Sequence, residues 1–385
     1  MHVQSQDPIP DVALPFPSAD HVANIVFTGD LNDCARRVAE HRPVCVIPGC
    51  ELGVVLADAL SELLGLPTNG SALTTARRDK LVMQRTIAAA GLRSIPSHAS
   101  SEWSSIQAWI KNLKRFPVII KPSASAATDQ VFVCTDLAQA EDAFKAIIGS
   151  AGMLGYRNDN VLAQQYVQGV EYMMNTVSVA GHHLMTDWWR INKVVSEHPV
   201  YEYGQLQSPT GELQRLIFEY TCAVLDVLGI RYGAVHTELM LTDEGPVLIE
   251  VNCRVDGQRT PVLVAAALGD SQIDVSLDAY LNPERFFARM AAPSSSLRRH
   301  ASRVELICPK TGKLIGLPML EQVRTLRAFF QLDMHVHPGE DIPRTIDLKT
   351  CPGYVDLIHD DPSVIQEDYL RIREWEAASF YQFAE

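Results

Sequence analysis

The amino-acid sequence predicts a mixed α/β protein with more than one domain. Short apolar runs that favour strands alternate with longer segments of helical periodicity through the first 165 residues. From residue 171 onward, segments with period-two alternation are joined by short turn sequences, which is typical of antiparallel hairpins. The chain has 385 residues, more than one hydrophobic core usually serves, so we expect two or three domains.

Composition and charge narrow the classes of protein to which the chain could belong. Hydrophobic residues make up 47% and charged residues 21%, which is ordinary for a soluble globular protein. The formal net charge of −13 disfavours binding to nucleic acid or to an anionic membrane. No apolar run approaches the roughly 18 residues of a membrane span, and the N-terminus lacks the features of a signal peptide. Eight scattered cysteines suit a reducing compartment, so we expect a cytoplasmic protein.

The first elements predict an α/β unit. Residues 42–50 read as a buried strand, and residues 51–66 follow as an amphipathic helix. Residues 74–92 predict a second helix, with Thr75 as its N-cap and Gly91 at its C-terminal end.

Strands dominate the middle of the chain. The pattern gives two strands, a helix and a strand, then an antiparallel pair turning at Ala180-Gly181, a long helix and a last hairpin. These segments are 116–123, 130–134, 136–149, 160–167, 171–193, 210–230 and 235–257. Residues 290–303 have the composition of a linker, and the remaining residues end in a charged helix.

The last hairpin places polar side chains on one face of two strands. The two alternating runs are separated by Asp243-Glu244-Gly245, a three-residue loop with glycine available for a left-handed position. A loop centred on Glu244 predicts that Glu238 faces Glu250. The same register predicts three further pairs: His236 with Asn252, Met240 with Leu248, and Thr242 with Pro246.

Two facing carboxylates require a stabilising partner, because like charges about 5 Å apart destabilise a strand pair. A divalent cation is one such partner, since Mg²⁺ takes carboxylate and amide oxygens and keeps substrate phosphates as its other ligands. Asn252, two positions along the same face, offers a third oxygen. A proton shared between the acids, or a slipped register that separates them, remains an alternative.

A candidate phosphate site lies earlier in the chain. Lys121 ends the apolar run "PVIIK", and a buried lysine is costly without an anionic partner. The sequence "PSASAATD" follows, and its small residues would let backbone N–H groups approach an anion closely. A lysine at the sheet edge that extends its amine into solvent is the alternative.

Four short sequences follow one another along the chain: "RRDK", "FPVIIKPSASAATD", "QQYVQGVEY" and "HTELMLTDEGPVLIEVNCR". Together they resemble the ATP-grasp superfamily, in particular the carboxylate–amine ligases that join amino acids. The resemblance covers nearly the whole chain. It agrees with the pair of facing acids, which was inferred from the residues alone.

The resemblance implies a nucleotide site. The residues that would contact ATP are Lys80, Lys121, Ser123, Ser125, Gln164, Tyr166, Val167 and Glu171. The two lysines would hold the α- and β-phosphates, and the serines belong to the phosphate loop. Gln164 and the backbone of residues 166–167 would meet the adenine, and Glu171 would hold the ribose hydroxyls.

The resemblance also implies a mechanism. A carboxylate attacks the γ-phosphate of ATP to give an acyl phosphate and ADP, and an amine then displaces the phosphate. Glu238, Glu250 and Asn252 would bind Mg²⁺ or Mn²⁺ across the β- and γ-phosphates. Arg254 would stabilise the acyl phosphate, and Lys193, with Arg190, would contact the γ-phosphate. His236 would orient a substrate.

An ATP-grasp fold with an N-terminal Rossmann-like domain is therefore expected. The predicted domains are residues 1–75, 76–165, 166–290 and 291–385. The sequence departs from the family in three places: alanine and serine replace glycine in the phosphate loop, little precedes "ADHVANIVF", and "CRVDGQ" replaces Arg-x-Gly-Gly. The second departure predicts that the first domain is shortened at its start. The expected partners are small carboxylates and amines, and a second copy in a homodimer.

Other interpretations stay open. The acyl phosphate could pass to a thiol on a carrier protein or enter bicarbonate-derived chemistry, or the chain could be an inactive nucleotide-binding subunit. Arg254 could instead form a salt bridge with Asp256 or Asp270. Arg190 and Lys193 could lie at a solvated hairpin end.

Overall fold

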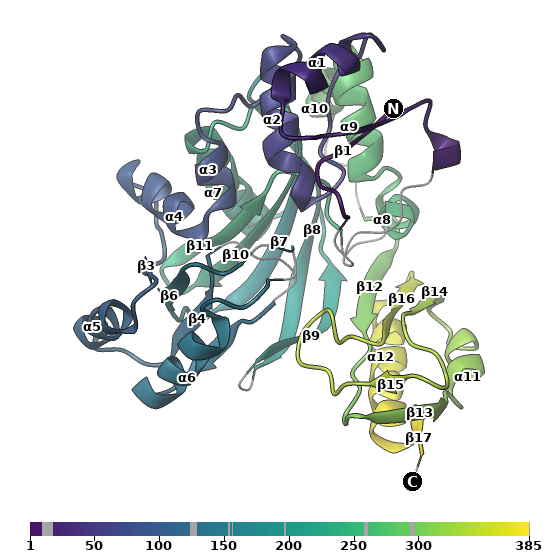
Figure 1. Ribbon diagram of the computed structural model, residues 1–385. Helices are drawn as coiled ribbons and strands as arrows, with labels where there is room; N and C mark the ends of the chain where they lie inside the picture. The colour runs from purple at the N-terminus through teal and green to yellow at the C-terminus, as the bar shows by residue number, and fades with distance from the viewer. Residues whose placement is uncertain are drawn as a thin grey trace.

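The computed structural model describes residues 1–9, 18–123, 129–152, 155, 157–195, 198–257, 261–292 and 297–384. An eight-stranded sheet of antiparallel neighbours forms its centre. In spatial order the strands are β11 (Gly245–Asn252), β10 (Gly233–Thr242), β7 (Val170–Val179), β8 (His182–Val195), β9 (Pro199–Leu206), β12 (His300–Glu305), β16 (Gly353–His359) and β14 (Phe329–Met334). Smaller units lie around this sheet (Figure 1), and the mixed α/β class is confirmed.

Helices cover both faces of the first strands of the sheet. On one face, α7 (Glu212–Val227) and α4 (Lys80–Ala89) pack against the apolar side of β11. On the other face lie α8 (Pro261–Leu268) and α9 (Gln272–Leu281), followed by α10 (Pro283–Ala291). The acids and the amide of the last hairpin project from this second face, opposite the apolar side of β11.

The N-terminal unit contains a parallel pair of strands, β1 (His2–Gln4) and β2 (Asn24–Val26). The pair packs against α1 (Leu31–Ala39) and α2 (Val54–Leu63) through apolar residues. The strand predicted over residues 42–50 is wrong, since no residue there is in a strand. Pro43 and Pro48 cannot donate hydrogen bonds to a sheet, and Val44 and Ile47 are exposed.

The helix predicted over residues 74–92 is broken in two. It forms α3 (Thr74–Arg78) and α4, and Leu73 rather than Thr75 precedes α3. Asp79 separates them because its side chain accepts a hydrogen bond of 2.8 Å from the N–H of Val82 and so caps α4. The break makes Lys80 the first residue of a helix.

A small domain lies beside the large sheet, near the bottom left of Figure 1. Its four-stranded sheet has the order β3 (Ser97–Ser100), β6 (Val161–Gln165), β4 (Val118–Pro122) and β5 (Phe132–Cys134). Helices α5 (Trp103–Leu113) and α6 (Leu137–Ile147) pack on the face that carries Val118 and Ile120. Lys121 and Gln164 belong to the opposite face, because Ile119 alternates with Val118 and pairs with Gln164.

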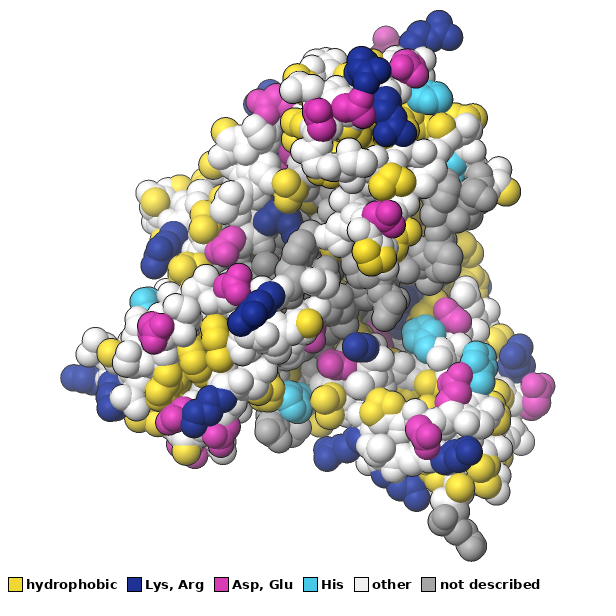
Figure 2. Space-filling view, in the orientation of Figure 1, with side chains coloured by type: hydrophobic (Ala, Val, Ile, Leu, Met, Phe, Trp, Pro, Cys, Tyr) yellow, Lys and Arg dark blue, Asp and Glu magenta, His cyan; other side chains and the backbone are white. Residues whose placement is uncertain are grey.

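The C-terminal segment continues the large sheet and also forms a separate three-stranded sheet. β12 pairs with β9 and β16, and β14 forms the sheet edge. The remaining elements are η1 (Ser18–Asp20), η2 (Glu51–Gly53), β13 (Gly312–Gly316), α11 (Leu320–Arg324), β15 (Asp341–Ile342), α12 (Pro362–Ala378) and β17 (Gln382–Phe383). The separate sheet has the strand order β15, β13 and β17. The space-filling view shows a notch between this C-terminal part and the small domain (Figure 2). The predicted domain limits remain a prediction.

Two features of the whole chain complete the description. Within the described ranges, no helix combines the length and apolar character needed to cross a membrane. All eight cysteines are free thiols.

Candidate active site

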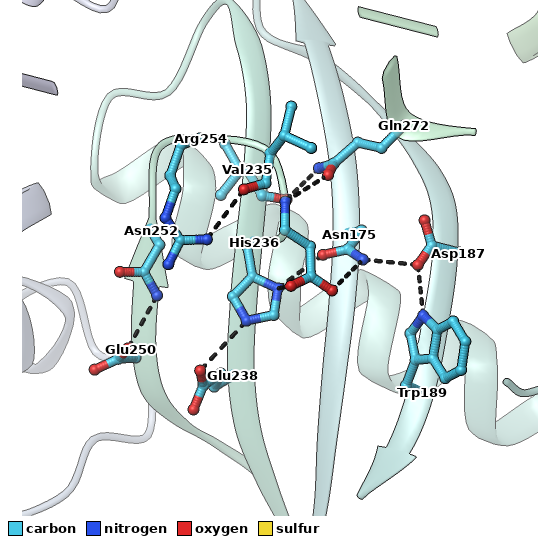
Figure 3. A network of polar contacts seen from close by, with 12 residues as sticks. Asn175, Asp187, Trp189, Val235, His236, Glu238, Glu250, Asn252, Arg254 and Gln272 are labelled. Atoms are coloured by element: carbon cyan, nitrogen blue, oxygen red, sulfur yellow. Dashed lines mark hydrogen bonds and ion pairs between the residues drawn. The ribbon is translucent and has the colours of Figure 1, made fainter. Parts of the chain in front are cut away.

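The predicted pairing of the two acids is confirmed. Glu238 on β10 lies directly opposite Glu250 on β11, and His236 lies opposite Asn252. Figure 3 shows both carboxylates on the same side of the hairpin. Neighbouring strands thus bring two carboxylates and one amide together.

The predicted pairs nearer the turn are wrong. Met240 pairs with Val247, and Thr242 with Gly245, which has φ +103°. The turn is therefore one residue shorter than expected. A β-bulge at Ile249, between the partners of Glu238 and Leu239, restores the register of the acids.

Lys80 neutralises one of the two acids. Its Nζ lies 2.8 Å from Oε2 of Glu250, and the amide Nδ2 of Asn252 donates to Oε1 of Glu250 at 2.9 Å. Burial alone would raise the pKa of Glu250, but Lys80, Asn252 and Lys121 outweigh it and lower that pKa to about 2. The carboxylate form of Glu250 is therefore favoured, with Lys80 as its cationic partner.

The donor set fits a hard divalent cation. Glu238, Glu250 and Asn252 offer oxygen atoms only, and Mg²⁺ normally takes few protein ligands because water and phosphate complete its shell. Consistent with that, the described residues contain no group of three His, Cys, Asp or Glu placed to hold a metal alone.

His236 supports Glu238 from within a buried polar network (Figure 3). Its Nε2 donates to Glu238 at 3.3 Å, and its Nδ1 donates to Oδ1 of Asn175 at 2.8 Å. Burial lowers the pKa of His236, but Asp256, 3.8 Å away, and Glu238 outweigh it and raise that pKa. Both ring nitrogens face oxygen atoms of neighbouring side chains, which favours the protonated ring.

The network around His236 is anchored on three elements. Asn175 donates to Asp187 on β8 at 2.7 Å and to Asp256 at 3.3 Å. Gln272, at the start of α9, accepts from the N–H of Asp256 at 2.9 Å and donates to two backbone carbonyls of β7 and β10. This bonding fixes the ring of His236, and its burial makes it a support for Glu238 rather than an open substrate contact.

Lys121 is the unusual cation of the site. It is 6% exposed, and its Nζ forms no hydrogen bond or ion pair with another described residue. Burial, followed by repulsion from Lys80, lowers its pKa to about 8, although Glu250 and Glu238 act against this. A buried ammonium group without a direct partner costs free energy, and an anion such as a phosphate would offset that cost.

Ser123, at the start of the predicted phosphate loop, lies next to Lys80. The carbonyl of Ser123 accepts from the N–H of Lys80 at 3.3 Å, and the buried hydroxyl of Ser123 makes no hydrogen bond within the described part of the chain. Ser125 lies outside the described residues.

The hinge residues lie where the small domain meets the large sheet. Gln164 is buried and donates to Ser97 Oγ at 2.9 Å, while Tyr166 and Val167 follow β6 and are partly exposed. Sequence reasoning missed Gly169. A Cβ atom there would lie 2.2 Å from the carbonyl oxygen of Leu241, so only glycine lets the hinge pass over β10.

Glu171 and Lys193, assigned to different parts of ATP, form an ion pair. Lys193 Nζ lies 2.7 Å from Oε1 of Glu171 and 4.1 Å above the ring of Tyr201. Burial raises the pKa of Glu171, and Lys193 opposes that effect. Arg190 is exposed and lies opposite Tyr172, on the face that packs against α7. It is therefore outside this site, and the solvated alternative applies to it.

Arg254 lies beyond the end of β11 and pairs with a residue that the sequence did not indicate. Its Nε lies 3.1 Å from Oε2 of Glu51, in the N-terminal unit. The alternative pairing with Asp256 or Asp270 is wrong. Asp270 binds Arg289, and Asp256 belongs to the network around His236.

A small cavity lies next to Arg254, between the N-terminal unit and the large sheet. Its volume is about 20 Å³, enough for one water molecule. Ile47, Asp58 and Tyr280 are among the residues that line it. In this conformation it does not hold a substrate.

Comparisons with known proteins agree with this geometry. The ATP-grasp domain family matches residues 114–262. Dapdiamide A synthase of Enterobacter agglomerans is 33% identical over 361 residues, covering 93% of this chain and 85% of that protein.

Solved structures resemble the fold over nearly the whole length. An L-amino acid ligase from Bacillus licheniformis superposes with a TM-score of 0.74 at 18% identity, covering 94% of this chain and 88% of the other. A carboxyaminoimidazole ribonucleotide synthase from Aspergillus clavatus, solved with ATP, gives a TM-score of 0.66 at 12% identity, covering 94% and 89%. The chain belongs to the ATP-grasp superfamily of carboxylate–amine ligases.

Proposed function

We propose that the protein uses ATP to activate a small carboxylate, an amino acid, as an acyl phosphate and joins it to an amine, releasing ADP and phosphate. The observation that carries this proposal is the facing pair Glu238 and Glu250, with Lys80 bonded to it. Lys121 lies close enough for its charge to act on Glu250. The names of the relatives, a dapdiamide synthase and an amino acid ligase, support amide-bond formation.

The residues divide into those that hold the nucleotide and those that hold the metal. Lys80 and Lys121 bind the α- and β-phosphates, with Ser123 and Ser125 beside them. Gln164, Tyr166 and Val167 bind the adenine, and Glu171 binds the ribose. Glu238, Glu250 and Asn252 hold Mg²⁺, or Mn²⁺, which neutralises charge on the transferred phosphoryl group.

Ligand binding requires an exchange of partners. Lys80 holds the carboxylate of Glu250, and Lys193 holds that of Glu171. With nucleotide bound, Lys80 would exchange Glu250 for a phosphate, which would leave Glu250 free to serve as a metal ligand. Lys193 and Arg254 would contact the transferred phosphoryl group, and His236 would keep Glu238 in place. The positive side chains act by positioning and by electrostatic stabilisation, the main needs of phosphoryl transfer.

One experiment separates this function from its alternatives. The wild-type protein is given ATP, Mg²⁺ and pairs from a panel of amino acids, and ADP and products are followed by a coupled assay and mass spectrometry. A ligase releases ADP only with both substrates and gives a dipeptide or another amide. ADP release that needs a thiol would indicate a carrier-dependent enzyme, and no release with any pair would contradict the proposal.

We also propose that the protein works as a cytoplasmic homodimer. Its free cysteines suit a reducing compartment. Ile273, Leu277 and Leu281 form an apolar stripe along α9, with Leu277 50% and Leu281 64% exposed. Such a stripe marks an interaction surface, and a two-fold axis lets it pack on itself.

Light scattering tests the dimer. The wild type should have twice the chain mass of 42.6 kDa, and Leu277→Glu should be a monomer. A monomeric wild type would exclude this surface as a dimer interface.

A further inference from the structure

Glu51 joins two arginines that come from different parts of the chain. It belongs to the short 3-10 helix η2 (Glu51–Gly53) in the N-terminal unit and is 7% exposed. Its Oε2 accepts from Nε of Arg254 at 3.1 Å, and its Oε1 contacts Nη1 of Arg78. Each carboxylate oxygen thus binds one guanidinium group.

Each of these two arginines is two residues away from a residue of the candidate metal site. Arg254 follows Asn252 by two residues, and its N–H donates to the carbonyl of Asn252 at 2.8 Å. Arg78 precedes Lys80 by two residues, and Lys80 is paired with Glu250. Glu51 therefore connects the N-terminal unit to the two segments that carry Lys80 and Asn252.

The contacts of Arg254 leave part of its guanidinium group for a ligand. Nε donates to Glu51, and Nη1 donates to the carbonyl of Val255 at 3.0 Å. Nη2 donates to no atom of the described residues. A guanidinium group held on two of its nitrogens has a fixed direction, which is the condition for binding a planar or tetrahedral oxyanion.

We propose that Glu51 is a positioning residue that orients Arg254 toward the acyl phosphate, so that the N-terminal unit completes the site. Buried carboxylates cost free energy unless they are paired, and here one partner, Arg254, belongs to the proposed site while the other, Arg78, precedes Lys80 by two residues. This inference rests on the proposed function. It differs from a merely structural role because Arg254 would act only on the reacting group and not on ATP binding.

The test is a kinetic cycle of Glu51→Gln and Arg254→Ala. Glu51→Gln should lower kcat about 10- to 100-fold, as expected when a supporting contact is lost, with the KM for ATP unchanged within twofold. In the Arg254→Ala background, Glu51→Gln should cause no further loss, because the residue through which it acts is gone. Asp58→Asn is the matched control, since Asp58 is also a buried acid of the N-terminal unit, paired with Arg77. Asp58→Asn should lower the unfolding temperature and leave kcat unchanged.

Two outcomes would overturn the proposal: an unchanged kcat in Glu51→Gln, or losses that multiply in the double variant. If the wild type shows no turnover with any substrate pair, the proposed function fails separately. Hydrogen exchange then tests the link itself. Glu51→Gln should increase exchange in the peptide containing Arg254 several-fold and Asp58→Asn should not, and equal exchange in both variants would refute it.

Discussion

Replacing Lys121 by methionine is expected to stabilise the protein while removing its affinity for ATP. Lys121 lies in β4, is 6% exposed and has no directly bonded partner among the described residues. Methionine fills nearly the same space without a charge, so the change removes the cost of burying an ammonium group and little else.

The magnitude follows from the pKa of Lys121. Burial lowers it from 10.5 to about 8. At about 1.4 kcal/mol per pK unit, the charged form costs the native state about 3 kcal/mol at pH 7. The folded pKa is below the unfolded one, so the unfolded chain binds more protons between pH 8 and 10.5, and the cost shrinks as pH rises through that range. At pH 9 the remaining cost is about 2 kcal/mol by the same relation.

Thermal and urea unfolding of the two proteins at pH 7 and pH 9 measure this difference. Lys121→Met should be the more stable protein at both values, with an advantage about 1 kcal/mol smaller at pH 9. Lys111→Met, at an exposed position of α5, is the control and should change neither value. ATP binding, followed by calorimetry, should fall below detection in Lys121→Met and remain in Lys111→Met.

Two results would refute the reasoning. A variant less stable than the wild type at pH 7 would mean that Lys121 has a bonded partner in solution. Undiminished ATP affinity would remove Lys121 from the phosphate site.

Three further predictions test other parts of the site. Glu250→Gln should lower kcat by about 10³-fold, the order of loss when a group stabilising transition-state charge is removed, with an unchanged circular dichroism spectrum; full activity would refute the metal assignment. Gly169→Ala should destabilise the protein by about 1–3 kcal/mol, because the added Cβ meets the carbonyl of Leu241 at 2.2 Å, and an unchanged unfolding temperature would contradict this close approach. Lys193→Met leaves Glu171 buried without its cation, so the double variant with Glu171→Gln should unfold at a higher temperature than Lys193→Met alone; the reverse order would show that the pair is not formed.

The sequence by itself determined the features that depend on neighbouring residues. The alternation of residues 235–257 and the turn at Asp243-Glu244 are local, and they were sufficient to place Glu238 opposite Glu250. The sequence indicates Lys121 as a candidate site residue because a lysine that ends an apolar strand is unusual. In the structure its side chain is buried. The order of four motifs indicated the family before any fold was known.

Only the tertiary structure decided the contacts between segments far apart in the chain. The pairing of Arg254 with Glu51 spans 203 residues, and the closeness of Gly169 to Leu241 depends on how two strands meet. The turn is one residue shorter than predicted, and the bulge at Ile249 offsets this, so that the two acids still pair. Pro43 and Pro48 prevent the apolar run between them from joining a sheet. A local sequence pattern predicts the face of a strand or helix on which a side chain lies. Burial and ion pairing depend on which distant segment packs against that face. This packing forms only when the whole chain folds.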